Sequence, residues 1–207
     1  MTPNHERRRA EEQYWERIAS EHYDPETKIL RDNWTKRQHI VRMLLEYDFS
    51  GKRILEIGCG LGIVATALRI PLGPDFDYIG TDICERFCQI ASELNRLDVY
   101  YTRADSLPFD NDSFDYLFLF DVMEHVRPDD RNDIYSEANR VLRKNSLVFL
   151  NNPLTQSRHD PEFDFGYDES DMADFCRVCR MHIEKVTTYG LRIKDSEYRY
   201  QFVVMRR

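Results

Sequence analysis

The sequence predicts an α/β domain in which a mostly parallel sheet is covered by helices on both faces, the doubly wound arrangement. Two observations lead to this prediction. From residue 53 onward, apolar stretches typical of buried strands alternate with amphipathic stretches typical of helices. Where the first strand turns into a helix, glycines occupy the alternate positions Gly58, Gly60 and Gly62. Such folds bind ligands beyond the carboxyl ends of their strands, so we expect a site at this turn.

Two helices are expected ahead of the sheet. The first carries apolar residues at helical spacing, namely Tyr14, Trp15, Ile18 and Ala19. The second opens with the capping-box pattern Thr35-Lys36-Arg37-Gln38 and continues with Ile40, Val41, Leu44 and Leu45.

The elements of the sheet follow in alternating order. The first are a strand at 53–57, the glycine-rich turn and a helix with Ile63, Val64 and Leu68. Next come a strand at 78–81, a helix at 84–94, strands at 99–102 and 116–120, a helix opened by Pro128 and a strand at 147–150. Near the C-terminus, Tyr198, Tyr200, Phe202 and Val204 alternate with Arg199, Gln201, Val203 and Met205. This alternation predicts an antiparallel strand with unlike faces, added at an edge of the sheet.

Composition and charge disfavour several classes of function. The 207 residues fit one domain, and 42% hydrophobic with 32% charged residues is ordinary for a folded protein. A net charge of -8 argues against a general binder of nucleic acids, and the run Arg7, Arg8, Arg9 lies among glutamates like a solvated helix face. No stretch approaches the ~20 apolar residues of a membrane span, and the charged N-terminus is unlike a secretory signal. We therefore expect a cytoplasmic protein without membrane or nucleic-acid partners.

The five cysteines are interpreted as packing residues. Two groups follow the spacing of a buried helical stripe: Cys84, Phe87, Cys88 and Ala91, and Met172, Phe175, Cys176 and Cys179. Cys176 and Cys179 have CxxC spacing with His182 close behind, but the second cysteine pair of a structural zinc site is missing. No metal is expected.

The glycine-rich turn and an acidic residue after the next strand indicate a cofactor that contains ribose. Glycine permits positive φ and lets the backbone approach a ligand closely. Asp82 stands about 20 residues beyond the glycines, where a carboxylate accepts hydrogen bonds from ribose hydroxyls. A nucleotide-dependent oxidoreductase remains an alternative, although its GxGxxG pattern requires glycine where Ile63 stands.

Two further segments complete a recognisable pattern, Ala104-Asp105-Ser106-Leu107-Pro108-Phe109 and the run from Phe114 to Val126. With them, residues 53 to 151 resemble the class I methyltransferase superfamily, particularly small enzymes similar to the ubiquinone-biosynthesis methyltransferases. The resemblance implies a Rossmann-like, seven-stranded sheet with an antiparallel C-terminal strand. It implies S-adenosylmethionine as cofactor and S-adenosylhomocysteine as product. It also implies a single domain, 1–207, with an N-terminal helical lid over 1–50 and a core over 51–207.

The resemblance assigns cofactor contacts residue by residue. The array Glu56-x-Gly58-x-Gly60-x-Gly62, which includes Cys59, is expected to hold the amino-acid end, and Asp82 with Ile83 the ribose. Asp105 matches the residue that faces the adenine amino group, and Ser106 and Leu107 supply neighbouring contacts. Phe120 and Asp121 are expected near the sulfonium.

His125 is the candidate catalytic residue. Methyl transfer requires an acceptor lone pair in line with the methyl group, and a hydroxyl or ammonium acceptor must also lose a proton. His125 follows the strand that ends in Phe120 and Asp121, and imidazole is suited to proton transfer near neutrality. Two roles stay open, a general base and a residue that braces the loop or lines the pocket.

Two segments are candidate walls of the acceptor site. The aromatic residues Tyr14, Trp15 and Tyr23 either line it or pack the lid onto the sheet. The stretch Asn151 to Tyr167 either is a solvated loop or attracts a cationic amine through His159, Asp160, Glu162, Phe163, Asp164, Phe165 and Tyr167. We expect a small-molecule methyl acceptor, at oxygen or nitrogen, ahead of protein and RNA. A non-catalytic module that binds the cofactor is the remaining alternative.

Overall fold

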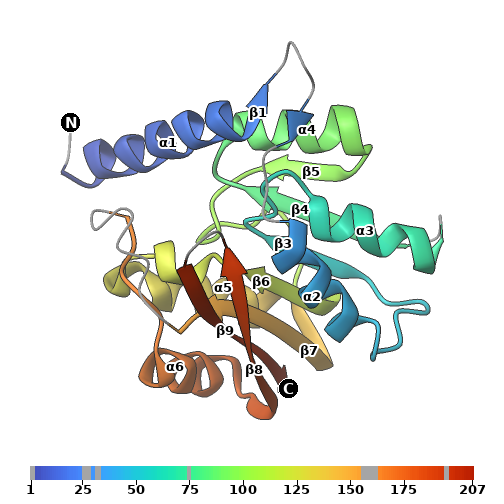
Figure 1. Cartoon of the computed structure of the whole chain (residues 1–207). Coiled ribbons are helices and arrows are strands. Elements are labelled where there is room, and N and C mark those ends of the chain that lie inside the picture. Colours follow the sequence, from blue (N-terminus) through green and yellow to red (C-terminus); the bar gives the residue numbers. More distant parts are fainter. Residues whose placement is uncertain (1–2, 25–28, 31–33, 74–75, 155–162, 194–195) are drawn as a thin grey trace.

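The computed structural model describes residues 3–24, 29–30, 34–73, 76–154, 163–193 and 196–207, which form an α/β structure around a seven-stranded sheet (Figure 1). Its strands are β3 (Ile54–Ile57), β4 (Tyr78–Asp82), β5 (Asp98–Tyr101), β6 (Phe114–Phe120), β7 (Leu142–Pro153), β8 (His182–Ile193) and β9 (Ser196–Arg206). Their order across the sheet is β5-β4-β3-β6-β7-β9-β8, and β1 (Tyr23–Asp24) pairs separately with β2 (Ile29–Leu30). Neighbouring strands from β5 to β7 are parallel, whereas β9 is antiparallel to both of its neighbours. The predicted fold class is confirmed.

Helices cover both faces of the sheet (Figure 1). They are α1 (Pro3–His22), α2 (Trp34–Leu44), α3 (Ile63–Leu72), α4 (Glu85–Asn95), α5 (Arg131–Val141) and α6 (Glu169–Cys179), with short 3-10 helices η1 (Met123–His125) and η2 (Pro128–Asp130). Successive residues of a strand point to opposite faces. Ile54 accordingly packs with Leu44 of α2, while Leu55 packs in the core that contains Phe175 of α6. Burial of both faces explains why β3 is apolar throughout apart from Glu56.

Helix α1 packs against α4, its neighbour in Figure 1. Ala19 is fully buried with Cys84, Phe87 and Ile90 of the α4 region, and Trp15 and Ile18 border this cluster. The expected apolar stripe of the first helix is therefore confirmed. In α2 the capping prediction is wrong, because the helix already includes Trp34 and Thr35 lies inside it.

The C-terminal strands differ from the prediction in two respects. Strand β8 was not predicted, because its exposed side chains mix Lys, Glu and Thr with Ile183 and Val186 and show no regular alternation. Strand β9 is antiparallel as expected, but it lies between β7 and β8 and not at the edge. Residues 200–205 are therefore buried on both faces, Gln201 included, so the expectation of unlike faces is wrong.

The glycine-rich turn has the backbone that its sequence predicts. Gly58, Gly60 and Gly62 have φ of +68°, +53° and +70°, which only glycine adopts readily. A Cβ on Gly62 would lie 2.2 Å from Cδ1 of Leu97, and one on Gly58 would lie 2.4 Å from Cγ2 of Val122. Gly60 is therefore required for its backbone conformation. Gly58 and Gly62 are required both for their backbone conformation and because a Cβ atom would not fit.

The cysteines are free thiols, and four of them are buried. Cys84, Cys88 and Cys179 lie in the predicted helical stripes, while Cys176 is half-buried with its Sγ 3.7 Å from Sδ of Met205. Among the described ranges, none of the helices is both long enough and apolar enough to cross a membrane.

Candidate active site

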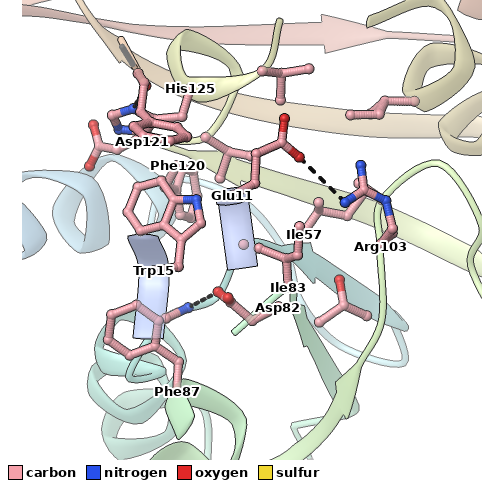
Figure 2. Close-up of a pocket in the computed structure, with 18 of the residues that line it drawn as sticks. Glu11, Trp15, Ile57, Asp82, Ile83, Phe87, Arg103, Phe120, Asp121 and His125 are labelled. Atoms are coloured by element: carbon pink, nitrogen blue, oxygen red, sulfur yellow. Dashed lines mark hydrogen bonds and ion pairs between the residues drawn. The ribbon is translucent and has the colours of Figure 1, made fainter. Parts of the chain in front are cut away.

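A cavity of about 400 Å³ opens at the carboxyl ends of β3, β4 and β6, beside α1 (Figure 2). Of the residues proposed from the sequence, Gly58, Gly60, Asp82, Ile83, Asp105, Phe120, Asp121 and His125 line it. Glu56, Cys59, Gly62, Ser106 and Leu107 do not. The sequence missed further lining residues from other elements, among them Glu11, Ile18, Lys36, Arg37, Arg103 and Arg127. The cavity lies where a parallel α/β sheet is expected to bind ligands.

Asp82 connects the glycine-rich turn to the end of β4. Its Oδ2 accepts a hydrogen bond from the backbone N–H of Gly60 at 2.9 Å, and its Oδ1 accepts one from the N–H of Cys84 at 2.9 Å. The residue is 8% exposed. Burial raises the pKa of Asp82 to about 6, although the backbone donors oppose this rise. The result is a fixed carboxylate at the cavity wall with lone pairs suited to hydroxyl donors.

Glu56, Cys59 and Gly62 lie behind this wall and shape it. The Tyr78 hydroxyl donates a 2.6 Å hydrogen bond to Oε2 of Glu56, and burial raises the pKa of Glu56 to about 7. The N–H of Gly62 donates to the carbonyl of Cys59 at 2.9 Å, which closes the turn.

Asp105 reaches the cavity from the loop after β5. Arg8 of α1 places its Nη2 3.2 Å from Oδ2 of Asp105, and Nε of Arg103 lies 3.4 Å from the same carboxylate. The two residues expected beside it diverge, since Ser106 is exposed and Leu107 is buried in the core. Of this motif, Ala104 and Asp105 line the cavity, and Ser106 and Leu107 do not.

Helix α1 is held over the cavity by ion pairs. Glu11 lies 3.5 Å from Nη1 of Arg103 and 3.6 Å from Nε of Arg127, and Arg7 pairs with Asp130 at 2.7 Å. Sequence spacing gives no signal for such pairs, because the partners lie more than 90 positions apart. Their opposite charges are the only hint that the sequence contains. Together they place the N-terminal half of α1 across the mouth of the site.

The two aromatic residues of α1 differ in role: Trp15 lines the cavity, whereas Tyr14 makes a packing contact. Trp15 lines the cavity, and its ring meets that of His125 edge-on at 5.0 Å between centroids (Figure 2). Tyr14 stacks on Phe163 at 4.2 Å, which is a packing contact. The Tyr23 side chain lies outside the described residues.

Asp121 is held in a strained, highly charged position at the end of β6. Its φ is +57°, an uncommon value for a residue other than glycine. Nζ of Lys36 and Nη1 of Arg37, both from α2, lie 2.7 Å and 3.1 Å from its Oδ2, and Asn151 donates to its Oδ1 at 2.9 Å. Burial opposes ionisation, but the two cations outweigh it and lower the pKa of Asp121.

His125 stands at the opposite end of the cavity from the Asp105 loop. Its Nδ1 lies 2.8 Å from the carbonyl oxygen of Phe163, and its Nε2 lies 4.0 Å from Oε1 of Glu124. Glu124 is 3% exposed, and burial followed by the nearby charge of Asp121 raises its pKa well above the ordinary value. The sequence indicated His125 through its place after β6, but it gave no sign that Glu124 is buried beside it.

The segment after β7 is packed where it is described. Phe163 and Tyr167 are buried, and the guanidinium of Arg127 lies 4.9 Å over the ring of Phe165. A solvated loop is therefore wrong for these residues, whereas His159, Asp160 and Glu162 lie outside the described residues. In the part of the chain that is described, no group of three His, Cys, Asp or Glu side chains is arranged to hold a metal ion.

Comparison with known proteins gives consistent matches. Residues 55–150 match the family described as a methyltransferase domain. A probable S-adenosylmethionine-dependent methyltransferase of Mycolicibacterium smegmatis is 25% identical over 171 residues, which are 79% of this chain and 61% of that protein. A probable phthiotriol/phenolphthiotriol dimycocerosates methyltransferase 2 of Mycobacterium ulcerans is 37% identical over 106 residues, 49% of this chain and 40% of that protein. The chain thus spans roughly half of each of these relatives.

Among solved structures, a SAM-dependent methyltransferase of Methanosarcina mazei superposes with a TM-score of 0.66 at 19% identity. The superposition covers 80% of this chain and 96% of that one. At this identity the likeness concerns the fold alone.

Proposed function

Because residues 55–150 place this chain in the class I S-adenosylmethionine-dependent methyltransferase superfamily, we propose that it transfers the methyl group of that cofactor to a small-molecule acceptor, at oxygen or nitrogen. The observation that carries the proposal is Asp82. Its buried carboxylate is fixed by the backbone of the glycine-rich turn and lies in the cavity wall.

The cavity fits the cofactor in size and chemistry. Small-molecule sites span about 300–1,000 Å³, and this one measures about 400 Å³. No atom lies within 4 Å of the Cβ position on Gly60, so a ligand can approach the backbone there. The cofactor carries no phosphate, in agreement with the absence of a P-loop lysine in the turn.

We assign roles to the residues that line the cavity. Gly58 and Gly60 hold the amino-acid end, with Glu56, Cys59 and Gly62 maintaining the shape of the turn. Asp82 accepts hydrogen bonds from the ribose, and Ile83 packs beside it. Asp105 faces the adenine amino group, while Phe120 and Asp121 border the sulfonium. When bound, the cofactor supplies the activated methyl group, and the protein positions the acceptor against it.

Helix α1 supports a small acceptor. Residues 1–50 act as a lid on the core, 51–207, of a single domain, because Glu11, Trp15 and Ile18 line the cavity from α1. A wall built partly from α1 favours a small acceptor over a protein or RNA chain. The Mycobacterium ulcerans relative is named for phthiotriol/phenolphthiotriol dimycocerosates, and this name favours a small molecule over a protein or RNA.

Transfer of labelled methyl groups tests this function. The protein is incubated with S-adenosylmethionine labelled in the methyl group and, separately, with small-molecule, protein and RNA fractions of a cell extract. Label in the small-molecule fraction supports the proposal, whereas label in protein or RNA replaces its acceptor class. Calorimetric binding of S-adenosylhomocysteine without any transfer would identify a binding module. Binding of a nicotinamide cofactor in its place would identify an oxidoreductase.

A further inference from the structure

The carboxylate of Glu11 on α1 is shared between two arginines that line the cavity. Its Oε2 lies 3.5 Å from Nη1 of Arg103, on the loop after β5, and its Oε1 lies 3.6 Å from Nε of Arg127, which precedes η2. Figure 2 shows the side chain of Glu11 pointing toward Arg103. Charge-assisted hydrogen bonds between nitrogen and oxygen are about 2.7–2.9 Å long. Glu11 therefore forms a close bond with neither arginine.

Arg127 is the less well paired of the two arginines. Its Nε is buried and has no hydrogen-bond partner in the part of the chain that the structure describes. The guanidinium lies 4.9 Å over the ring of Phe165, and this contact orients its plane. Asp130 also lines the cavity, but it pairs with Arg7 at 2.7 Å. Arg127 thus presents an oriented, planar set of donors that the distant carboxylate of Glu11 only partly satisfies.

Positive charge exceeds negative charge along this side of the cavity. Arg8 and Arg103 lie 3.2 Å and 3.4 Å from the carboxylate of Asp105. Arg103 and Arg127 in turn share the carboxylate of Glu11. In this chain of ion pairs, three guanidinium groups therefore share two carboxylates. A partly buried guanidinium in such a chain is stabilised by a further anion, and a carboxylate matches its planar fork.

We propose that the methyl acceptor carries a carboxylate, that Arg127 binds this group through its guanidinium, and that the acceptor displaces Glu11 from Arg127. This inference rests on the proposed function and names the charge class of its acceptor. The methyl group goes to an oxygen or nitrogen elsewhere on the acceptor, so the carboxylate keeps its charge in the product. Arg127 takes part in recognition, and no bond is made or broken at it.

The surroundings of Arg127 indicate the shape of the acceptor. Glu11 already places a carboxylate beside Nε of Arg127, so a group of this size and charge fits there. Trp15, Val126 and Phe163 line the same cavity and offer apolar surface to the rest of the molecule. We therefore expect an acid with an apolar skeleton.

Binding of a probe acid tests the site without turnover. With the whole chain saturated with S-adenosylhomocysteine, the ¹⁹F signal of 4-fluorobenzoate should broaden, and that of neutral 4-fluorobenzamide should not. Arg127→Met should abolish the broadening while still binding S-adenosylhomocysteine in calorimetry. Arg177→Met, the same change at an exposed position on α6, should leave it unchanged. The proposal would be overturned if the acid did not broaden, if acid and amide broadened equally, or if Arg127→Met behaved as the wild type. Stronger broadening of 4-fluorophenyl phosphate would replace the carboxylate by a phosphate.

Fractionation of the acceptor completes the test. The small molecules of the extract are separated by ion exchange into acidic, neutral and basic fractions before the transfer assay. Label should enter the acidic fraction, and the labelled product should remain acidic. Label in the neutral or basic fraction alone would overturn this inference while methyl transfer stands, and no label in any fraction would instead overturn the proposed function.

Variants measured on the acceptor so identified separate the roles of the two residues. Arg127→Met should raise KM about tenfold to a hundredfold with little change in kcat, because a charged hydrogen bond to the acceptor is lost. Glu11→Gln should lower KM about twofold to fivefold, because the competing carboxylate loses its charge. A KM for Arg127→Met equal to that of the wild type would refute binding by Arg127. A raised KM for Glu11→Gln would refute the displacement of Glu11.

Discussion

Protonation of Asp82 is expected to weaken the binding of S-adenosylhomocysteine. In the proposed binding mode, ribose hydroxyls donate to the ionised carboxylate, so binding favours that form. The pKa of Asp82 is raised to about 6 by burial, and its carboxylate therefore picks up a proton as pH falls through 6. Well below this point the affinity should fall about tenfold per pH unit. Between pH 7 and pH 5 the ionised fraction drops to about one tenth, which corresponds to about 1.4 kcal/mol of binding free energy.

The Asp82→Asn variant separates this effect from other titrations. The N–H groups of Gly60 and Cys84 each donate to one carboxylate oxygen at 2.9 Å, and a neutral amide offers only one acceptor oxygen and no charge. In the proposed binding mode, the charge-assisted hydrogen bond to the ribose is therefore lost. Such bonds contribute about 1.5–3 kcal/mol, and affinity at pH 8 should fall about tenfold to a hundredfold. Below pH 7 the variant should then show no further dependence on this carboxyl group.

Calorimetric titrations at pH 8, 7, 6 and 5 measure both effects, with circular dichroism to confirm that each sample is folded. Asp98→Asn, the same change at an exposed position on β5, is the matched control and should bind as the wild type does at every pH. If Asp82→Asn showed the same tenfold loss between pH 7 and pH 5 as the wild type, Asp82 would not be the titrating contact.

Three further perturbations address stability and the lid. Glu56 has a folded-state pKa raised to about 7 from 4.5, so the folded state holds its proton more tightly and stability falls as pH rises from 4.5 to 7. Glu56→Gln, which stays neutral, should therefore raise the free energy of unfolding at pH 8 by about 1–3 kcal/mol and change little at pH 4, as measured by urea unfolding. Gly62→Ala introduces a Cβ at φ +70° that would lie 2.2 Å from a leucine methyl, and should cost about 2–4 kcal/mol in the same assay. Gly51→Ala, at φ +64° in open space, should cost only about 1 kcal/mol, and equal losses would contradict the steric argument. Arg8→Ala removes the ion pair between α1 and Asp105 and should speed release of S-adenosylhomocysteine about twofold to fivefold in stopped-flow experiments. The release rate of the variant should depend less on salt concentration than that of the wild type. An unchanged rate would show that this pair does not restrain the lid.

Patterns among residues close in sequence correctly predicted several features of the structure. The buried stripe of Cys84 and Phe87, the parallel strands and the positive φ of Gly58 each follow from neighbouring residues, and the structure confirms them. Asp82 was found because its distance from the glycines is set by one helix and the strand that follows it, α3 and β4.

Non-local contacts were beyond the reach of such patterns. The pairs that Lys36 and Arg37 form with Asp121 join residues 84 or more positions apart, and a charged residue in a helix looks the same whether its partner is solvent or a distant carboxylate. The place of β9 was missed for a related reason. The alternation of polar and apolar residues along a strand indicates which residues share a face of the sheet. It does not indicate which strands pair with it, and these pairings decide its position in the sheet.

The strand order also has a consequence for assembly. Strand β8 pairs with β9 alone, although it precedes β9 in the chain. The strands from β3 to β7 can form a complete five-stranded parallel sheet without either of them, since each crossover is already in place. We therefore expect the β8–β9 hairpin to form as a unit and to dock onto the free edge of β7 late in folding. Until then that edge offers unpaired backbone groups, and a chain stalled at this stage would be the species most prone to aggregate.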